Sequence, residues 1–151
     1  MTEIVLKAGA KWIQYREKDR TRREAYTEAQ RLRELTKRFG AALIVNDHAD
    51  IALSVDADCV HLGQGDLPLK EARKIMGDKI IGISTHSLAE ALEASEGSAD
   101  YIGFGPVFET STKDAGMPKG VMMLKEIKDS VKIPVVAIGG ISKENLRSVL
   151  A

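Results

Sequence analysis

Residues 59–66 read Cys-Val-His-Leu-Gly-Gln-Gly-Asp, a short apolar run that ends in glycines and a carboxylate. Residues 42–47 read Ala-Leu-Ile-Val-Asn-Asp and repeat the pattern of an apolar run followed by polar side chains. Short apolar runs rich in β-branched residues are typical of strands that are buried on both faces of a parallel sheet. We therefore expect an α/β fold in which polar residues follow the strands.

Six runs of this kind occur along the chain, and helix-period segments separate them. The expected strands are Trp12–Tyr15, Ala42–Val45, Cys59–Leu62, Ile80–Ile83, Tyr101–Phe104 and Val135–Ile138. The expected helices are Arg22–Arg38, Leu69–Met76, Ser87–Ser95, Met122–Asp129 and Lys143–Leu150, several with Ser or Asp positioned as N-caps. Because strand and helix alternate, we predict right-handed β/α units of the (β/α)8 TIM-barrel type.

The chain has 151 residues, which suits a single domain over residues 1–151 but is short for a closed eight-stranded barrel of about 250 residues. We therefore expect an incomplete barrel of six parallel strands, truncated at both ends. Its edge strands would be Trp12–Tyr15 and Val135–Ile138, and both are apolar. Exposed apolar edges seek partners, so the sequence predicts self-association.

Composition narrows the partners and the compartment. The 22 basic and 22 acidic side chains cancel, and no Lys/Arg block is long enough to follow a nucleic-acid backbone. No apolar stretch approaches the roughly 20 residues that span a bilayer, and Met1–Ile4 does not begin a signal peptide. The single Cys59 lies in an apolar run and is expected in the core. These features favour a soluble cytoplasmic protein with neither nucleic-acid nor membrane partners.

Charged side chains follow the first strand. Because parallel strands end on the same side of a sheet, residues that follow different strands converge at one rim. Arg16 and Lys18 lie two positions apart and point the same way if the extended backbone persists. A guanidinium and an ammonium on one face suit a diphosphate, whereas the alternative is a solvated loop without a role.

Two carboxylates follow the next strands. Asp47 comes after Asn46 at the end of one run, and Asp66 follows the neighbouring run after Gly63-Gln64-Gly65. Mg²⁺ takes a few carboxylate oxygens together with substrate phosphate and water, so this pair suits it. The alternative is that Asp47 caps the following helix and Asp66 makes a turn before Pro68.

The second half of the chain offers further polar groups after strands. Ser84 could hydrogen-bond a ligand, and the long loop from Glu109 to Gly120 carries hydroxyls and a cation that suit an anion clamp, at Thr110, Thr112 and Lys113. A polar loop without a role is the alternative. The amides of Gly139 and Gly140 could cradle a phosphate at a strand-to-helix turn, although packing also selects glycine. The three histidines show no metal-ligand spacing.

Taken together and in order, these motifs closely resemble the thiamine-phosphate synthase family over nearly the whole chain. The resemblance rests on residues 14–18, 46–47, 61–68, 82–86, 103–113 and 137–141. It implies that hydroxymethylpyrimidine diphosphate and a thiazole phosphate join to give thiamine phosphate and pyrophosphate. It also implies a dissociative reaction, assisted by Mg²⁺, in which the diphosphate departs before the thiazole nitrogen attacks.

The resemblance implies a role for each motif residue. Asp47 and Asp66 would hold Mg²⁺. The diphosphate would be gripped by Arg16, Lys18, Asn46 and Lys113, and the pyrimidine would be lined by Gln14 and Ser84. The thiazole phosphate would be received by Thr110, Thr112, Gly139 and Gly140. The catalytic set is Arg16, Lys18, Ser84 and Lys113.

The chain departs from the family pattern in two respects. Gly65 stands where the family has an acidic residue, and the family's first and eighth barrel strands are absent. Two alternatives therefore stay open. One is a thiazole tautomerase of the same superfamily, which needs no metal-diphosphate site, and the other is a catalytically silent phosphate-binding barrel fragment.

Overall fold

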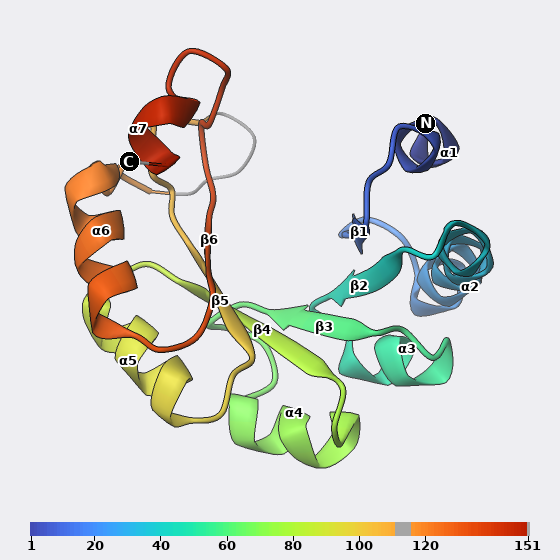
Figure 1. Ribbon diagram of the computed structural model, residues 1–151. Helices are drawn as coiled ribbons and strands as arrows, with labels where there is room; N and C mark the ends of the chain where they lie inside the picture. The colour runs from blue at the N-terminus through green and yellow to red at the C-terminus, as the bar shows by residue number, and fades with distance from the viewer. Residues whose placement is uncertain (111–115, 151) are drawn as a thin grey trace. The chain divides into compact units, whose positions relative to one another are not determined.

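The computed structural model describes residues 1–110 and 116–150. Strands and helices alternate along the chain (Figure 1). Within these described residues the sheet has six strands in the order β1-β2-β3-β4-β5-β6, fewer than the eight of a closed barrel. The predicted α/β fold with six parallel strands is confirmed. The chain divides into two compact units, residues 1–81 and 82–151, and the prediction of one domain stays a prediction.

The first unit contains three complete strands and four helices. Its elements are α1 (Thr2–Lys7), β1 (Trp12–Tyr15), α2 (Arg22–Phe39), β2 (Ala42–Asn46), α3 (Ala49–Ser54), β3 (Cys59–Leu62) and α4 (Leu69–Met76). Strands β1 and β2 pair in parallel with Tyr15 opposite Val45, and β2 and β3 pair with Asn46 opposite His61. These registers align the carboxyl ends of the three strands. Strand β3 is buried throughout, and Cys59 is a core residue as predicted.

Helix α2 begins at a capping box. The Thr21 hydroxyl accepts from the Glu24 amide, and the Glu24 carboxylate accepts from the Thr21 amide at 2.9 Å. The buried stripe of the helix carries Ala25, Ala29 and Thr36. These small side chains let the helix backbone pack closely, so the cap sets where α2 begins and the buried stripe sets which side of it faces the unit.

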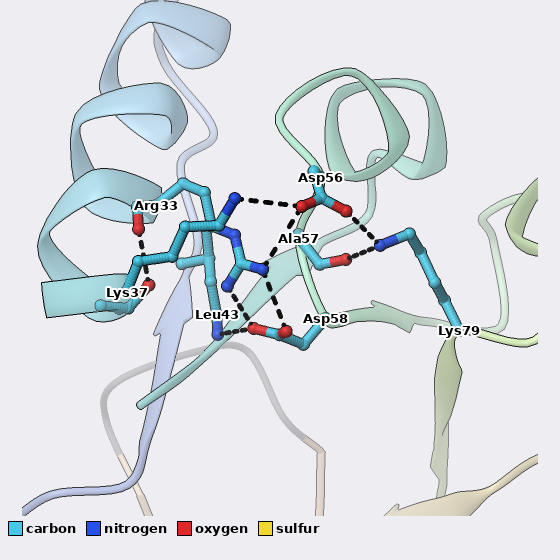
Figure 2. A network of polar contacts seen from close by, with 8 residues as sticks. Arg33, Lys37, Leu43, Asp56, Ala57, Asp58 and Lys79 are labelled. Atoms are coloured by element: carbon cyan, nitrogen blue, oxygen red, sulfur yellow. Dashed lines mark hydrogen bonds and ion pairs between the residues drawn. The ribbon is translucent and has the colours of Figure 1, made fainter. Parts of the chain in front are cut away.

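A network of ion pairs ties α2 to the residues that precede β3 and β4 (Figure 2). The Arg33 guanidinium donates to both oxygens of Asp58, at 2.6 and 3.1 Å, and the same carboxylate accepts from the Leu43 amide at 2.8 Å. Asp56 pairs with Lys37 at 3.1 Å and with Lys79 at 2.8 Å. The network lies where β2 and β3 begin, at the end of the strands away from the predicted site.

The second unit contains the rest of the chain. Its elements are β4 (Ile80–Thr85, which begins in the first unit), α5 (Leu88–Glu96), β5 (Tyr101–Phe104), α6 (Gly120–Ser130), β6 (Val135–Ala137) and α7 (Leu146–Leu150). Strands β4 and β5 pair in parallel, as do β5 and β6. Ser87 caps α5 by accepting from the Glu90 amide, as predicted. Its core includes Ile102, Phe104 and Ile127.

Helix α7 is shorter than the sequence predicts, because it begins at Leu146 and not at Lys143. The Asn145 side chain accepts from the Ser142 amide at 2.8 Å and donates to the Gly140 carbonyl at 2.8 Å. Such side-chain bonds compete with helical hydrogen bonding, so residues 142–145 form a turn. Among the described residues, none of the helices is both long and apolar enough to cross a membrane.

Candidate functional site

Polar side chains of the first unit gather at the carboxyl ends of β1, β2 and β3. Arg16 directly follows β1, Asp47 directly follows β2, and Asp66 lies in the turn after β3. The Asp47 amide donates to the His61 carbonyl at 2.9 Å, which continues the pairing of β2 with β3 by one residue. The aligned registers therefore bring these three positions to the same edge.

Asp47 and Asp66 lie side by side. Burial raises the pKa of the Asp47 carboxyl, and Asp66 raises it further through a shared hydrogen bond and charge repulsion. The nearby charges of His48 and Lys18 lower this pKa but offset only part of the rise. The Asp66 carboxyl and the Lys18 ammonium are thus both close enough to act on Asp47, which suits a site for a cation and an anionic substrate.

The backbone around Asp47 is held in an uncommon conformation. Its φ is +64°, in the left-handed region, and the Asn46 side-chain amide donates to its carboxylate. The N-cap of α3 is His48, and no side chain caps that helix, so the alternative that Asp47 is a helix cap is wrong. Asp66 accepts from the Gly63 amide at 2.6 Å, which confirms that it also stabilises its turn.

The loop after β1 bends sooner than an extended continuation would. The Glu17 carboxylate accepts from the amides of Lys18 and Asp19, at 2.8 and 3.0 Å, and both bonds lower its pKa. The extended backbone therefore ends before Lys18. The prediction that Arg16 and Lys18 point the same way required extended backbone through both residues, and the structure does not meet that requirement. Arg16 is exposed, with no side-chain ion pair to any described residue, and Gln14 is exposed on β1.

The sequence did not predict a contact beside this site, which we call the Arg22 clasp: Arg22 bonds to His48 and Asp50. The Arg22 guanidinium donates to Nδ1 of His48 at 2.7 Å and forms an ion pair with Asp50. It thereby joins the first turn of α2 to the start of α3. The partners are more than 25 positions apart in the chain, and only the packing of α2 beside α3 brings them together. No pattern in the sequence marks this contact.

The described candidates of the second unit lie within or after its strands. Ser84 lies within β4, which continues to Thr85, and its side chain is half-buried. Thr110 is half-buried after β5. Gly139 and Gly140 follow β6 with φ angles of +96° and +64°. Thr112 and Lys113 lie outside the described residues.

The carboxylate pair of the first unit is a small donor set. Across residues 1–110 and 116–150, no group of three or more His, Cys, Asp or Glu side chains is arranged to hold a metal ion. Two carboxylates that leave the other positions to water and substrate are the arrangement that Mg²⁺ accepts and that Zn²⁺ in a closed structural site does not. The donor set therefore fits Mg²⁺ with a phosphorylated substrate.

Comparison with known proteins assigns the chain to a family. The family model for thiamine monophosphate synthase matches residues 1–151. A thiamine-phosphate synthase from Chloroflexus aurantiacus is 50% identical over 149 residues, which cover 98% of this chain and 69% of that protein. Another, from Halalkalibacterium halodurans, is 52% identical over 152 residues, covering 99% of this chain and 72% of that protein.

A solved structure agrees with the sequence comparisons. The thiamine phosphate pyrophosphorylase from Pyrococcus furiosus superposes with a TM-score of 0.91 at 49% identity, over 98% of this chain and 71% of that one. The sequence identity and the fold therefore point to the same family. The chain belongs to the thiamine monophosphate synthase family and is a transferase of thiamine biosynthesis.

Proposed function

We propose that the chain couples hydroxymethylpyrimidine diphosphate to a thiazole phosphate and releases pyrophosphate. The observation that carries this proposal within the first unit is the adjacent Asp47 and Asp66 carboxylates with the Lys18 charge close by. A tautomerase that moves a proton on a thiazole phosphate has no need for paired carboxylates of this kind. The arrangement therefore favours diphosphate chemistry.

Asp47 and Asp66 are the residues that would hold Mg²⁺. Bound there, the cation would neutralise charge on the departing diphosphate. Burial and mutual repulsion make the two ionised carboxylates unfavourable together, so a cation that relieves the repulsion gains binding energy. The Asn46 amide holds the Asp47 carboxylate in place, and the Gly63 amide does the same for Asp66.

The other residues of the predicted set would bind and orient the two substrates. Arg16, Lys18, Asn46 and Lys113 would grip the diphosphate, and Gln14 with Ser84 would line the pyrimidine. Thr110, Thr112 and the amides of Gly139 and Gly140 would receive the thiazole phosphate. A dissociative departure of the diphosphate asks for positioning and charge stabilisation, which these groups offer without a covalent nucleophile.

An assay with both substrates separates this function from its alternatives. The chain is incubated with Mg²⁺, the pyrimidine diphosphate and the thiazole phosphate, and pyrophosphate is measured. Release that depends on the thiazole phosphate is the expected result. Isomerisation of the thiazole without release would identify a tautomerase instead, and binding without turnover would identify a silent phosphate-binding fragment.

We also propose that the chain associates with a second copy through its edge strands. Among the described residues β1 pairs only with β2, and the Trp12 side chain on it is 53% exposed. Strand β6 pairs only with β5 in the same described set, and Val136 on it is 48% exposed. Unpaired apolar edges offer backbone donors and acceptors to another chain. A monodisperse monomer in light scattering would contradict this proposal.

The cytoplasm is the compartment that we propose for the reaction. The chain has one cysteine, Cys59, which is buried and has no second cysteine in the chain to pair with. A protein that relies on no disulfide suits a reducing compartment.

A further inference from the structure

In the turn formed by Gly139 and Gly140, the two backbone carbonyls accept hydrogen bonds, whereas the two backbone amides donate none to a described residue. The Gly139 carbonyl accepts from the Phe108 amide at 3.0 Å, and the Gly140 carbonyl accepts from the Asn145 side chain at 2.8 Å. The amides of the two glycines donate to no described residue. Successive backbone amides without an intramolecular acceptor form a concave donor surface that suits an anion.

Packing fixes the path of this turn. A Cβ at Gly140 would lie 2.3 Å from the Glu109 carbonyl oxygen, and a Cβ at Gly139 would lie 2.6 Å from Cβ of Pro106. Both positions also have positive φ angles, so a side chain would be strained there as well as crowded. The backbone of residues 106–109 therefore supports one side of the turn.

Asn145 supports the other side. Its Nδ2 donates to the Gly140 carbonyl at 2.8 Å, and its Oδ1 accepts from the Ser142 amide at 2.8 Å. One half-buried side chain thus bridges both ends of the segment 140–142. A carbonyl that is already paired at Gly140 cannot rotate toward the space in front of the amides without losing that bond.

We propose that Asn145 is a positioning residue for the phosphate of the second substrate. It holds the Gly139–Gly140 turn in the conformation that presents both amides to an anion, and it does not itself touch the substrate. This inference rests on the proposed function, which places a phosphate at that turn. The occupant is a phosphate monoester dianion, because two neutral amides bind a compact anion without requiring a metal.

Amide NMR titration of the ¹⁵N-labelled full chain tests this role. The probes are inorganic phosphate and the phosphorylated thiazole, and the signals followed are the backbone amides of Gly139 and Gly140. Both signals are expected to shift on binding. In Asn145→Ala the dissociation constant for phosphate should rise about tenfold, the size expected when the turn loses the side-chain hydrogen bonds of Asn145.

Ser148→Ala is the matched control. Ser148 donates to the Asn145 backbone carbonyl at 2.7 Å, so this variant removes a bond of similar length from the same segment but leaves the turn intact. Its phosphate affinity should equal that of the parent, and pyrimidine diphosphate affinity should be unchanged in both variants. Asn145→Gln retains an amide on a longer side chain. It should recover part of the phosphate affinity that Asn145→Ala loses.

The outcomes distinguish this inference from the proposed function. If Asn145→Ala binds phosphate at Gly139 and Gly140 as tightly as the parent does, the role of Asn145 is overturned. The proposed function would still stand. Equal losses for thiazole phosphate and pyrimidine diphosphate would identify a general folding defect and also overturn it. A parent that binds neither probe would remove the phosphate site and, with it, both proposals.

Discussion

The ion pair between Arg33 and Asp58 should be the strongest polar contribution to the stability of the first unit. Asp58 receives both arms of the guanidinium and the Leu43 amide, and the side chains are 12% exposed for Arg33 and 35% for Asp58. We predict that Asp58→Ala lowers the free energy of unfolding markedly, because it removes the carboxylate that Figure 2 shows bonded to Arg33 and Leu43.

The size of this loss of unfolding free energy follows from the partial burial of the Arg33–Asp58 ion pair. Breaking a fully buried pair costs about 3–5 kcal/mol, and an exposed pair is worth about 0–1 kcal/mol. An intermediate value of about 2 kcal/mol suits this pair, and the Leu43 amide that loses its acceptor adds about 1 kcal/mol. Asp58→Ala should therefore cost about 3 kcal/mol. Arg33→Met, which keeps most of the aliphatic stem, should cost about 2 kcal/mol.

Urea unfolding of the single and double variants measures these values. The double variant should recover about 1–2 kcal/mol relative to the sum of the single losses, because each single change leaves a charge without its partner. Lys37→Met is the control. Its ion pair with Asp56 is exposed, so the loss should stay within about 0.5 kcal/mol. Additive losses for Arg33 and Asp58 would refute the reasoning.

Three further predictions concern the carboxylates and the start of α2. Asp47→Asn should unfold at a higher temperature than the parent at neutral pH, and it should lose stabilisation by Mg²⁺. Because the pKa of Asp47 is raised in the folded protein, the gap between the two unfolding temperatures should grow as pH rises above about 3.9 and vanish below it. Thermal scans across pH measure this gap. Asp56 has the opposite sign: its ion pairs lower its pKa, so the advantage of the parent over Asp56→Asn should be present above about pH 4 and disappear on further acidification, in acid titrations followed by circular dichroism. Thr21→Ala should cost about 1 kcal/mol in urea unfolding, and an unchanged midpoint would show that the capping box does not stabilise α2.

The strands were predictable because each is a short apolar run, although only the central strands are largely buried, and β1 and β6 at the edges are partly exposed. The bounds of β1, β3 and β5 agree with the sequence prediction residue for residue. The start of α7 was not predictable from periodicity, because Asn145 bonds to the backbone of the turn before it. The bend at Lys18 has a similar cause, since the Glu17 carboxylate captures the next two amides.

The candidate site was predictable in its residue types and less so in its contacts. Polar residues after parallel strands must lie at one edge, which places Asp47 and Asp66 at the carboxyl ends of β2 and β3. Their direct contact depends on the left-handed backbone at Asp47, which no spacing reveals. The clasp of Arg22 on His48 depends on helix packing.

On the proposed function, Asp47 and Asp66 form the metal-diphosphate site of a synthase. The most direct measurement is the rate of pyrophosphate release against Mg²⁺ concentration, with both substrates present, for the parent and for Asp66→Ala. Asp78→Ala is the control, because this exposed carboxylate follows α4 and has no partner among the described residues. The proposed site predicts metal-dependent release in the parent and the control, and none in Asp66→Ala. An unchanged Mg²⁺ response in Asp66→Ala would contradict it.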